Sequence, residues 1–196
     1  LNILEIGPGN GSLTKKIINK KPKNLDLIEI DKDLVDELNK TFCVYKFVNI
    51  INANILKYDL KKNYDLVVSN LPYNISSQVL VKLALMNIIP KQMILMFQKE
   101  FAIKLTDKKL NAINSIINCF YKIDIKFHVS KNCFKPIPKV NSSILKFEKL
   151  NKSLIRKNEI EDFIKFKRYL FSHKRKSLKT LLKKLKIKSE FNSDIR

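Results

Sequence analysis

All three glycines of this 196-residue chain lie within five positions, at Gly7, Gly9 and Gly11. Average usage would place roughly 14 glycines in a chain of this length. Other turns must therefore be made by Asn, Asp, Ser and Pro, which tolerate turn geometry. Glycine is required where the backbone takes a positive φ, or where something approaches too closely for a Cβ. The cluster predicts a ligand-binding loop, whereas an ordinary strand-to-helix turn would need about one glycine.

The loop has the spacing Gly-x-Gly-x-Gly and is preceded by Glu5 at the end of an apolar run. A dinucleotide fingerprint would need glycine at Ser12, and a Walker loop would need Gly-Lys-Ser/Thr. Glu29 ends the next apolar run, and the carboxyl ends of parallel strands form the ligand crevice of such folds. A carboxylate there can accept hydrogen bonds from both hydroxyls of a ribose. The alternative is that both acids are solvated strand-end carboxylates.

This arrangement resembles that of class I methyltransferases that depend on S-adenosylmethionine. The resemblance implies a site for that cofactor at Glu5, Gly7, Gly9, Gly11 and Glu29.

Residues 69–74 (Ser-Asn-Leu-Pro-Tyr-Asn) could present an adenine to such a cofactor. The N6 amine is a poor nucleophile because its lone pair is delocalised into the ring. The Asn70 side-chain oxygen and the Leu71 carbonyl can each accept one N6 hydrogen. Pro72 fixes the turn and withholds a competing N–H, and Tyr73 offers a ring on which a base can stack. The alternative is a turn that merely ends a strand.

With these motifs the chain resembles the ribosomal RNA adenine N6-dimethyltransferase family, most closely the bacterial and organellar enzymes that act on small-subunit rRNA. The resemblance implies S-adenosylmethionine-dependent dimethylation of adenine N6 in small-subunit rRNA during ribosome biogenesis. It implies catalytic roles for Asn70, Leu71, Pro72, Tyr73 and Phe134, with Phe134 covering the adenine opposite Tyr73, and cofactor contacts by Asn70 and Asn54. The matching segments are residues 4–14, 28–31, 70–76, 97–100, 134–142 and 171–178.

Three features depart from the family pattern. Asn54 stands where the family usually has an Asp that contacts the cofactor adenine, and an amide oxygen can still accept that hydrogen bond. Residues 109–115 replace the usual Tyr-Gly-Arg-Leu-Ser, which puts an RNA contact or a helix packing there in doubt. The family's upstream Gly-Gln-Asn-Phe segment is absent because the chain starts too late. Since the chain starts without Met and inside an expected strand, we expect the true N-terminus to be missing.

Apolar patterns of strand and helix alternate over about 150 residues, which predicts a largely parallel sheet covered on both faces. The expected fold is α/β, a Rossmann-like class I methyltransferase with a mostly parallel seven-stranded sheet, its last two strands paired as a hairpin-like edge, and a small, truncated C-terminal all-α domain. Expected strands are 1–6, 25–30, 45–50, 65–69, 91–97, 122–129 and 140–147. Expected helices are 12–20, 31–40, 76–87 (capped by Ser76 or Ser77), 98–105, 110–120, 159–171 and 173–188.

The formal net charge is +21, from 39 Lys and Arg against 18 Asp and Glu, which favours a polyanionic partner. We expect a catalytic domain over 1–148, without its N-terminal segment, and a basic helical rRNA-docking domain over 149–196, truncated at its C-terminus. A solvated amphipathic helix and a membrane-surface helix are the alternatives for the basic stretch. The residues expected to contact RNA phosphates are Lys174, Arg175, Lys176, Lys179 and Lys183.

Other classes of protein are disfavoured. Three cysteines and two histidines without metal-ligand spacing give no support to a metal site or a disulfide framework. No apolar run approaches the ~18 residues of a membrane span. We expect a monomer in the cytoplasm, with an organelle matrix as the alternative because a targeting segment could precede Leu1.

Two other functions remain open on the sequence alone. One is a large-subunit rRNA adenine methyltransferase of the macrolide-resistance type. The other is a non-catalytic RNA-binding assembly or transcription factor of the same family, which the changes at Asn54 and residues 109–115 would fit.

Overall fold

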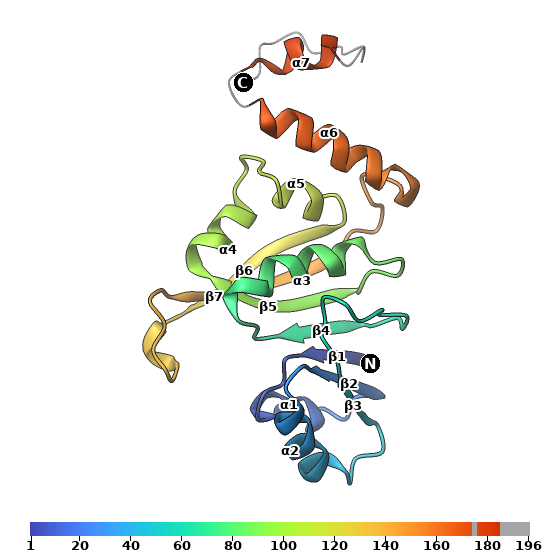
Figure 1. The fold of residues 1–196 in the computed structure, drawn as a ribbon, viewed down its shortest axis with the longest axis vertical. Helices are drawn as coiled ribbons and strands as arrows, with labels where there is room; N and C mark the ends of the chain where they lie inside the picture. Colours follow the sequence, from blue (N-terminus) through green and yellow to red (C-terminus); the bar gives the residue numbers. More distant parts are fainter. Residues whose placement is uncertain (174–175, 185–196) are drawn as a thin grey trace.

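The computed structural model describes residues 1–173 and 176–184, and it places seven strands in one sheet of order β3-β2-β1-β4-β5-β7-β6 (Figure 1). Strands β1 to β5 run parallel, and β7 is antiparallel to both β5 and β6. The predicted mostly parallel sheet with a hairpin-like edge is therefore confirmed. The strands are β1 (Asn2–Ile6), β2 (Asn24–Glu29), β3 (Val48–Asn52), β4 (Leu66–Ser69), β5 (Gln92–Gln98), β6 (Tyr121–Val129) and β7 (Ser142–Lys149).

Helices cover both faces of the sheet because successive strand residues point to opposite sides. In β1, Ile3 packs with α1 (Ser12–Ile18) and α2 (Lys32–Phe42) on one face. Leu4 and Ile6 pack on the other face, in the larger core that also takes residues of the next three helices. Those helices are α3 (Tyr73–Leu85), α4 (Lys99–Thr106) and α5 (Asn114–Ile117).

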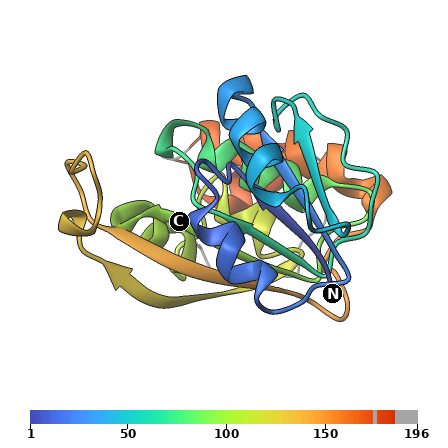
Figure 2. The same cartoon turned by 90° about the horizontal axis from the view of Figure 1, so that it is seen from below.

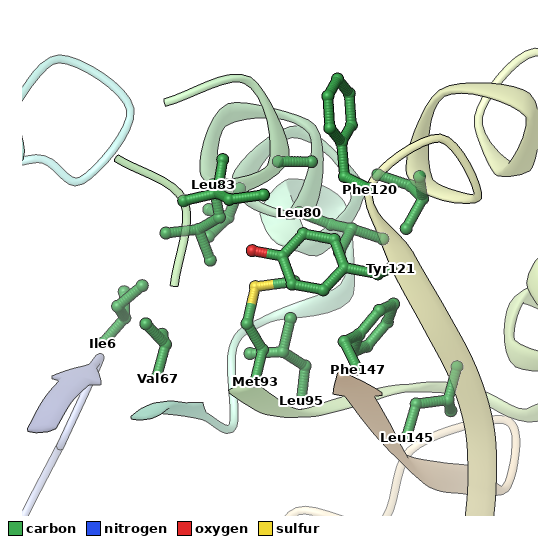
Figure 3. Packing of buried hydrophobic residues seen from close by; sticks show 14 of the residues in the cluster. Ile6, Val67, Leu80, Leu83, Met93, Leu95, Phe120, Tyr121, Leu145 and Phe147 are labelled. Carbon is green, nitrogen blue, oxygen red and sulfur yellow. The ribbon is translucent and has the colours of Figure 1, made fainter. Parts of the chain in front are cut away.

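The larger core joins the antiparallel edge to the parallel strands (Figure 3). Tyr121 of β6 is 1% exposed. Its ring packs edge-on against the ring of Phe147 in β7, with 6.3 Å between the ring centroids. The Tyr121 hydroxyl donates a 2.9 Å hydrogen bond to the carbonyl of Pro90, just before β5. Met93 and Leu95 of β5 lie against the same cluster. The antiparallel edge is therefore fixed relative to the strands whose ends could carry a site.

Helices α3 and α5 do not begin where predicted. Helix α3 begins at Tyr73, with Pro72 as its N-cap and no side-chain cap, and the Ser76 hydroxyl donates to the Tyr73 carbonyl, so the predicted serine cap was wrong. Pro72 has a φ of −53° and a ψ of 139°, so it is not helical itself, and the helix begins directly after it. The predicted helix over 110–120 is reduced to α5, because the preceding residues form a loop.

Two asparagines close that loop. Asn114 is fully buried, and its amide donates to the carbonyls of Lys104, Asp107 and Lys109. The Asn111 side-chain oxygen accepts from the backbone N–H groups of Ile113 and Asn114. The segment that departs from the family pattern is thus internally hydrogen-bonded and packed on the core.

Two further helices follow the sheet, α6 (Ile160–Ser172) and α7 (Leu178–Lys184). Phe163 and Ile164 of α6 pack against the larger core, and the buried Lys167 donates a 2.5 Å hydrogen bond to the Ala112 carbonyl. Helix α7 begins five residues later than predicted, since α6 ends at a C-cap on His173. Short 3-10 turns lie at Lys131–Cys133 (η1) and Lys157–Glu159 (η2). In the part of the chain that the structure covers, no helix is both long and apolar enough to span a membrane.

Candidate active site

The glycine loop leads from β1 into α1, and all three glycines have positive φ, between 57° and 76°. A Cβ on Gly11 would lie 2.7 Å from the Phe42 ring, so close packing of α2 requires glycine there. A Cβ on Gly9 would meet no atom within 4 Å. The loop is therefore packed on the protein at Gly11 and open at Gly9, where a ligand can approach its backbone.

Glu29 stands at the end of β2 and is held by three backbone N–H groups. Its Oε1 accepts from Ile30 at 2.8 Å and Asp31 at 3.1 Å, and its Oε2 accepts from Gly9 at 3.2 Å. Asn52 donates to the carbonyls of Glu29 and Ile30, which fixes the same turn. The carboxylate is 7% exposed, so it is not a freely solvated strand-end group. Its Oε2 has the longest of these bonds and keeps capacity to accept further hydrogen bonds.

Glu5 lies under the loop at 2% exposure, and the Thr14 hydroxyl donates a 2.7 Å hydrogen bond to its Oε2. Burial disfavours the charged form and raises the Glu5 pKa to about 7, while the Thr14 hydrogen bond acts in the opposite direction. This carboxyl therefore titrates near neutral pH. Thr14, the first buried residue of α1, was not singled out from the sequence.

The Asn70 turn is joined to the glycine loop by the pairing of β1 with β4. Ser69 pairs with Ile6, and its hydroxyl donates a 2.7 Å hydrogen bond to the Ile6 carbonyl. A Cβ on Gly7 would lie 3.1 Å from a methyl carbon of Leu71. Leu71 is buried whereas Asn70 is exposed. The two predicted motifs therefore meet at one point, with the Asn70 side chain facing outward beside the loop.

Tyr73 is tied to the antiparallel edge of the sheet. Its hydroxyl lies 2.6 Å from the hydroxyl of Ser142, the fully buried first residue of β7. Ser142 pairs with Gln98 at the end of β5, so β7 begins at the edge where the parallel strands end. Ser142 is the last residue of the family-like segment 134–142, and its sequence context predicts no role for it. Its partner Tyr73 lies 69 residues away, and no local pattern could show the contact.

Phe134 lies in the loop between β6 and β7, at the same edge of the sheet, and is half-buried. The structure therefore brings Phe134 to the side of the sheet that carries Tyr73. Figure 1 shows this loop, coloured gold, projecting beyond the end of β6 and the start of β7.

Asn54 lies just after β3, with its side chain half-buried. Its Oδ1 accepts a 2.9 Å hydrogen bond from the N–H of Leu56 and so holds a turn. Lys82 of α3 donates to the carbonyls of Leu56 and Tyr58, which fixes this turn to the helix. A carbonyl oxygen has two lone pairs, so Oδ1 keeps one for a ligand.

The described basic residues among those predicted to bind RNA lie on and just before α7, away from these motifs (Figure 1). Lys176, Lys179 and Lys183 are exposed on and before α7, while Leu181 and Leu182 of the same helix are buried. Lys174 and Arg175 fall outside the described residues. Within the described ranges, no three His, Cys, Asp or Glu side chains are grouped so that they could hold a metal ion.

Known proteins match both the sequence and the fold. The family model described as ribosomal RNA adenine dimethylase matches residues 1–193. The ribosomal RNA small subunit methyltransferase A of Malacoplasma penetrans is 39% identical, over 97% of this chain and 72% of its own length. The mitochondrial ribosomal RNA small subunit methyltransferase of Arabidopsis thaliana is 34% identical, over 97% of this chain and 51% of its own length.

Two solved structures share the fold. A dimethyladenosine transferase from Plasmodium falciparum superposes with a TM-score of 0.82 at 30% identity, over 92% of this chain and 66% of its own. The 23S rRNA methyltransferase ErmE superposes with a TM-score of 0.78 at 22% identity, over 94% of this chain and 75% of its own.

The sheet order, with a glycine loop after β1 and an acid at the end of β2, and the matching relatives define a Rossmann-like methyltransferase. More narrowly, the chain belongs to the ribosomal RNA adenine dimethylase family. The predicted fold, family and enzyme class, an rRNA adenine dimethyltransferase, are confirmed.

The buried Glu5 gives the fold a specific pH dependence. Its pKa is raised from 4.5 to about 7, so its contribution to stability is full below pH 4.5 and is lost as the pH rises through about 7. We expect wild type to lose on the order of 3 kcal/mol over this window relative to Glu5→Gln. Urea unfolding between pH 4 and 8 measures this difference. The exposed Glu37→Gln serves as control, and parallel curves for wild type and Glu5→Gln would contradict the assignment.

The Tyr73–Ser142 hydrogen bond can be isolated by a double-mutant cycle. Tyr73→Phe and Ser142→Ala each remove the same bond, so the double variant should be no less stable than the worse single variant. We expect a coupling free energy of about 1 kcal/mol in urea unfolding. Strictly additive losses would show that the two hydroxyls do not interact in solution.

Proposed function

We propose that this chain transfers methyl groups from S-adenosylmethionine to N6 of adenines in small-subunit rRNA, two per adenine, during ribosome biogenesis. The observation that carries the proposal is the contact of Leu71 with Gly7. It sets the acceptors for an adenine amine directly beside a loop built for a nucleoside ligand.

The residues of the loop region suit this cofactor. Gly9 leaves open space beside the backbone, and Glu29 Oε2 can accept from ribose hydroxyls. Asn54 Oδ1 can accept from an adenine amine, in place of the family's Asp. Glu5 adds negative charge near the loop when it is ionised. When bound, S-adenosylmethionine supplies a methyl group that its sulfonium already activates.

The chain's own contribution is to orient the target amine. Asn70 Oδ1 and the Leu71 carbonyl each accept one N6 hydrogen, which favours the pyramidal amine with its lone pair free. Pro72 holds these acceptors at the start of α3. Tyr73, fixed by Ser142, stacks on one side of the base, and Phe134 covers the other. Positioning of this kind supplies most of the acceleration, so no histidine base takes part.

Relatives at 34–39% identity that are named for the small ribosomal subunit support that target over the large subunit. The likeness to ErmE, at 22% identity, concerns the fold alone. Residues 149–196 form the rRNA-docking unit in this proposal, with Lys176, Lys179 and Lys183 contacting phosphates. The enzyme acts as a monomer, in the cytoplasm or an organelle matrix.

A non-catalytic RNA-binding role is the second candidate, favoured by Asn54 at a cofactor position. The hydrogen-bonded loop around Asn114 argues against a degraded catalytic domain. Calorimetry with S-adenosylmethionine separates the two functions. Binding supports the enzyme, and its absence from the full-length protein would support the other role.

Replacement of Asn70 tests the catalytic assignment. We expect Asn70→Ala to lower kcat for methyl transfer to undermethylated small ribosomal subunits by roughly 10²–10³-fold, the usual loss for a hydrogen-bonding group at a reacting centre. Labelled cofactor measures the transfer. Asn87→Ala, an exposed position past the end of α3, should leave it unchanged. If Asn70→Ala and wild type transferred label equally, the proposed chemistry would be wrong.

A further inference from the structure

We propose that residues 130–141, the loop between β6 and β7, form a phosphate-binding arm that holds the RNA backbone next to the target adenine. We call this segment the β6–β7 arm. The inference rests on the proposed function and adds an RNA contact within the catalytic domain, separate from the C-terminal helices.

The arm has an unbalanced charge. Lys131, Lys135 and Lys139 recur every four residues, and no acid occurs between Asp124 and Glu148. All three lysine residues are exposed. The arm therefore presents three positive charges to solvent without a neighbouring acid in sequence to neutralise them.

The arm is attached at the edge of the sheet where the adenine would lie. At its base, the N–H of Lys99 donates to the Asn141 carbonyl at 2.9 Å, and the N–H of Lys131 donates to Asn141 Oδ1 at 3.0 Å. The next residue, Ser142, holds the Tyr73 hydroxyl. The attachment point of the arm and Tyr73, on which the adenine would stack, are thus parts of one hydrogen-bonded unit.

The arm projects into solvent with its own local structure. Figure 2 shows it standing away from the body of the molecule beyond the ends of β6 and β7. The Ser130 hydroxyl accepts from the N–H of Asn132 and caps the η1 turn. Pro136 and Pro138 restrict the backbone that follows. A pre-formed arm loses little conformational freedom when it binds a backbone.

An apolar side chain completes the surface. Ile137, at the centre of the arm, is 63% exposed. A ribose or an unstacked base offers an apolar face, whereas a solvated basic loop needs no such residue. Lysines that contact phosphates on both sides of an exposed isoleucine suit a single-stranded segment of RNA.

The positive charge of the chain is concentrated in the half of the sequence that contains the arm. Residues 99–196 hold 26 Lys and Arg against 9 acids, whereas residues 1–98 hold 13 against 9. The arm lies within the basic half, between the catalytic motifs and the C-terminal helices in sequence.

The test compares two triple variants of the full-length protein. The arm variant carries Lys131→Gln, Lys135→Gln and Lys139→Gln. The matched control carries Lys20→Gln, Lys23→Gln and Lys46→Gln, which remove the same charge from the opposite edge, where β2 and β3 begin. Binding to a small-subunit rRNA transcript is measured across salt concentrations. We expect the slope of log Kd against log salt to fall by about 2 for the arm variant, since each lost phosphate contact in single-stranded RNA removes about 0.7.

Two further measurements, a Lys→Arg rescue variant and the kinetics of methyl transfer, distinguish a lost phosphate contact from a folding defect. The triple Lys→Arg variant of the arm should keep the wild-type slope. In methyl transfer, the arm variant should raise KM for RNA at least tenfold and change kcat less than twofold. Equal slopes for the arm variant and the control would overturn the proposal. The salt slope measures RNA binding and does not depend on methyl transfer. A wild-type protein that binds RNA without transferring methyl groups would refute the proposed function, but the slope would still test the arm.

Discussion

The site depends on the parallel pairing of β1 with β4. That pairing sets Ser69 beside Ile6, and the Ser69 hydroxyl bonds to the Ile6 carbonyl across the two strands. Gly7 and the Asn70 turn follow one residue after the paired positions in the two strands. Leu71 fills the space that a side chain at position 7 would need. The glycine loop and the Asn70 turn, in which Gly7 and Asn70 are 63 residues apart in sequence, are thereby held at one edge by strand pairing.

The remaining parts of the site extend from this edge along the sheet. On one side, Glu29 ties the end of β2 back to Gly9. On the other side, the Ser142 hydroxyl ties Tyr73 to the antiparallel edge, which carries Phe134 and the β6–β7 arm. The buried ring of Tyr121 and its bond to Pro90 hold that edge against β5. A rigid sheet with functional residues on the connecting loops is the usual arrangement in such folds.

The sequence was most informative where local chemistry is restrictive. The three glycines of a chain that otherwise lacks them predicted the loop. Short apolar runs predicted the first five strands, and alternating apolar residues predicted the last two. Contacts between distant segments could not be predicted, among them Tyr73 with Ser142 and Lys167 with Ala112. Helix α3 began at Tyr73, directly after Pro72, and not at the expected serine cap. The two-asparagine loop before α5 shows that a departure from a family pattern can still fold as a well-satisfied structure.

A crystal structure of the protein with S-adenosylhomocysteine and adenosine tests the central claim most directly. The account predicts ribose hydroxyls on the Glu29 carboxylate, and the adenosine amine within hydrogen-bonding distance of both Asn70 Oδ1 and the Leu71 carbonyl. Nucleoside density elsewhere, for example in the open groove beside α3 lined by Leu56, Ser77 and Lys82, with no ribose hydroxyl on Glu29, would contradict it.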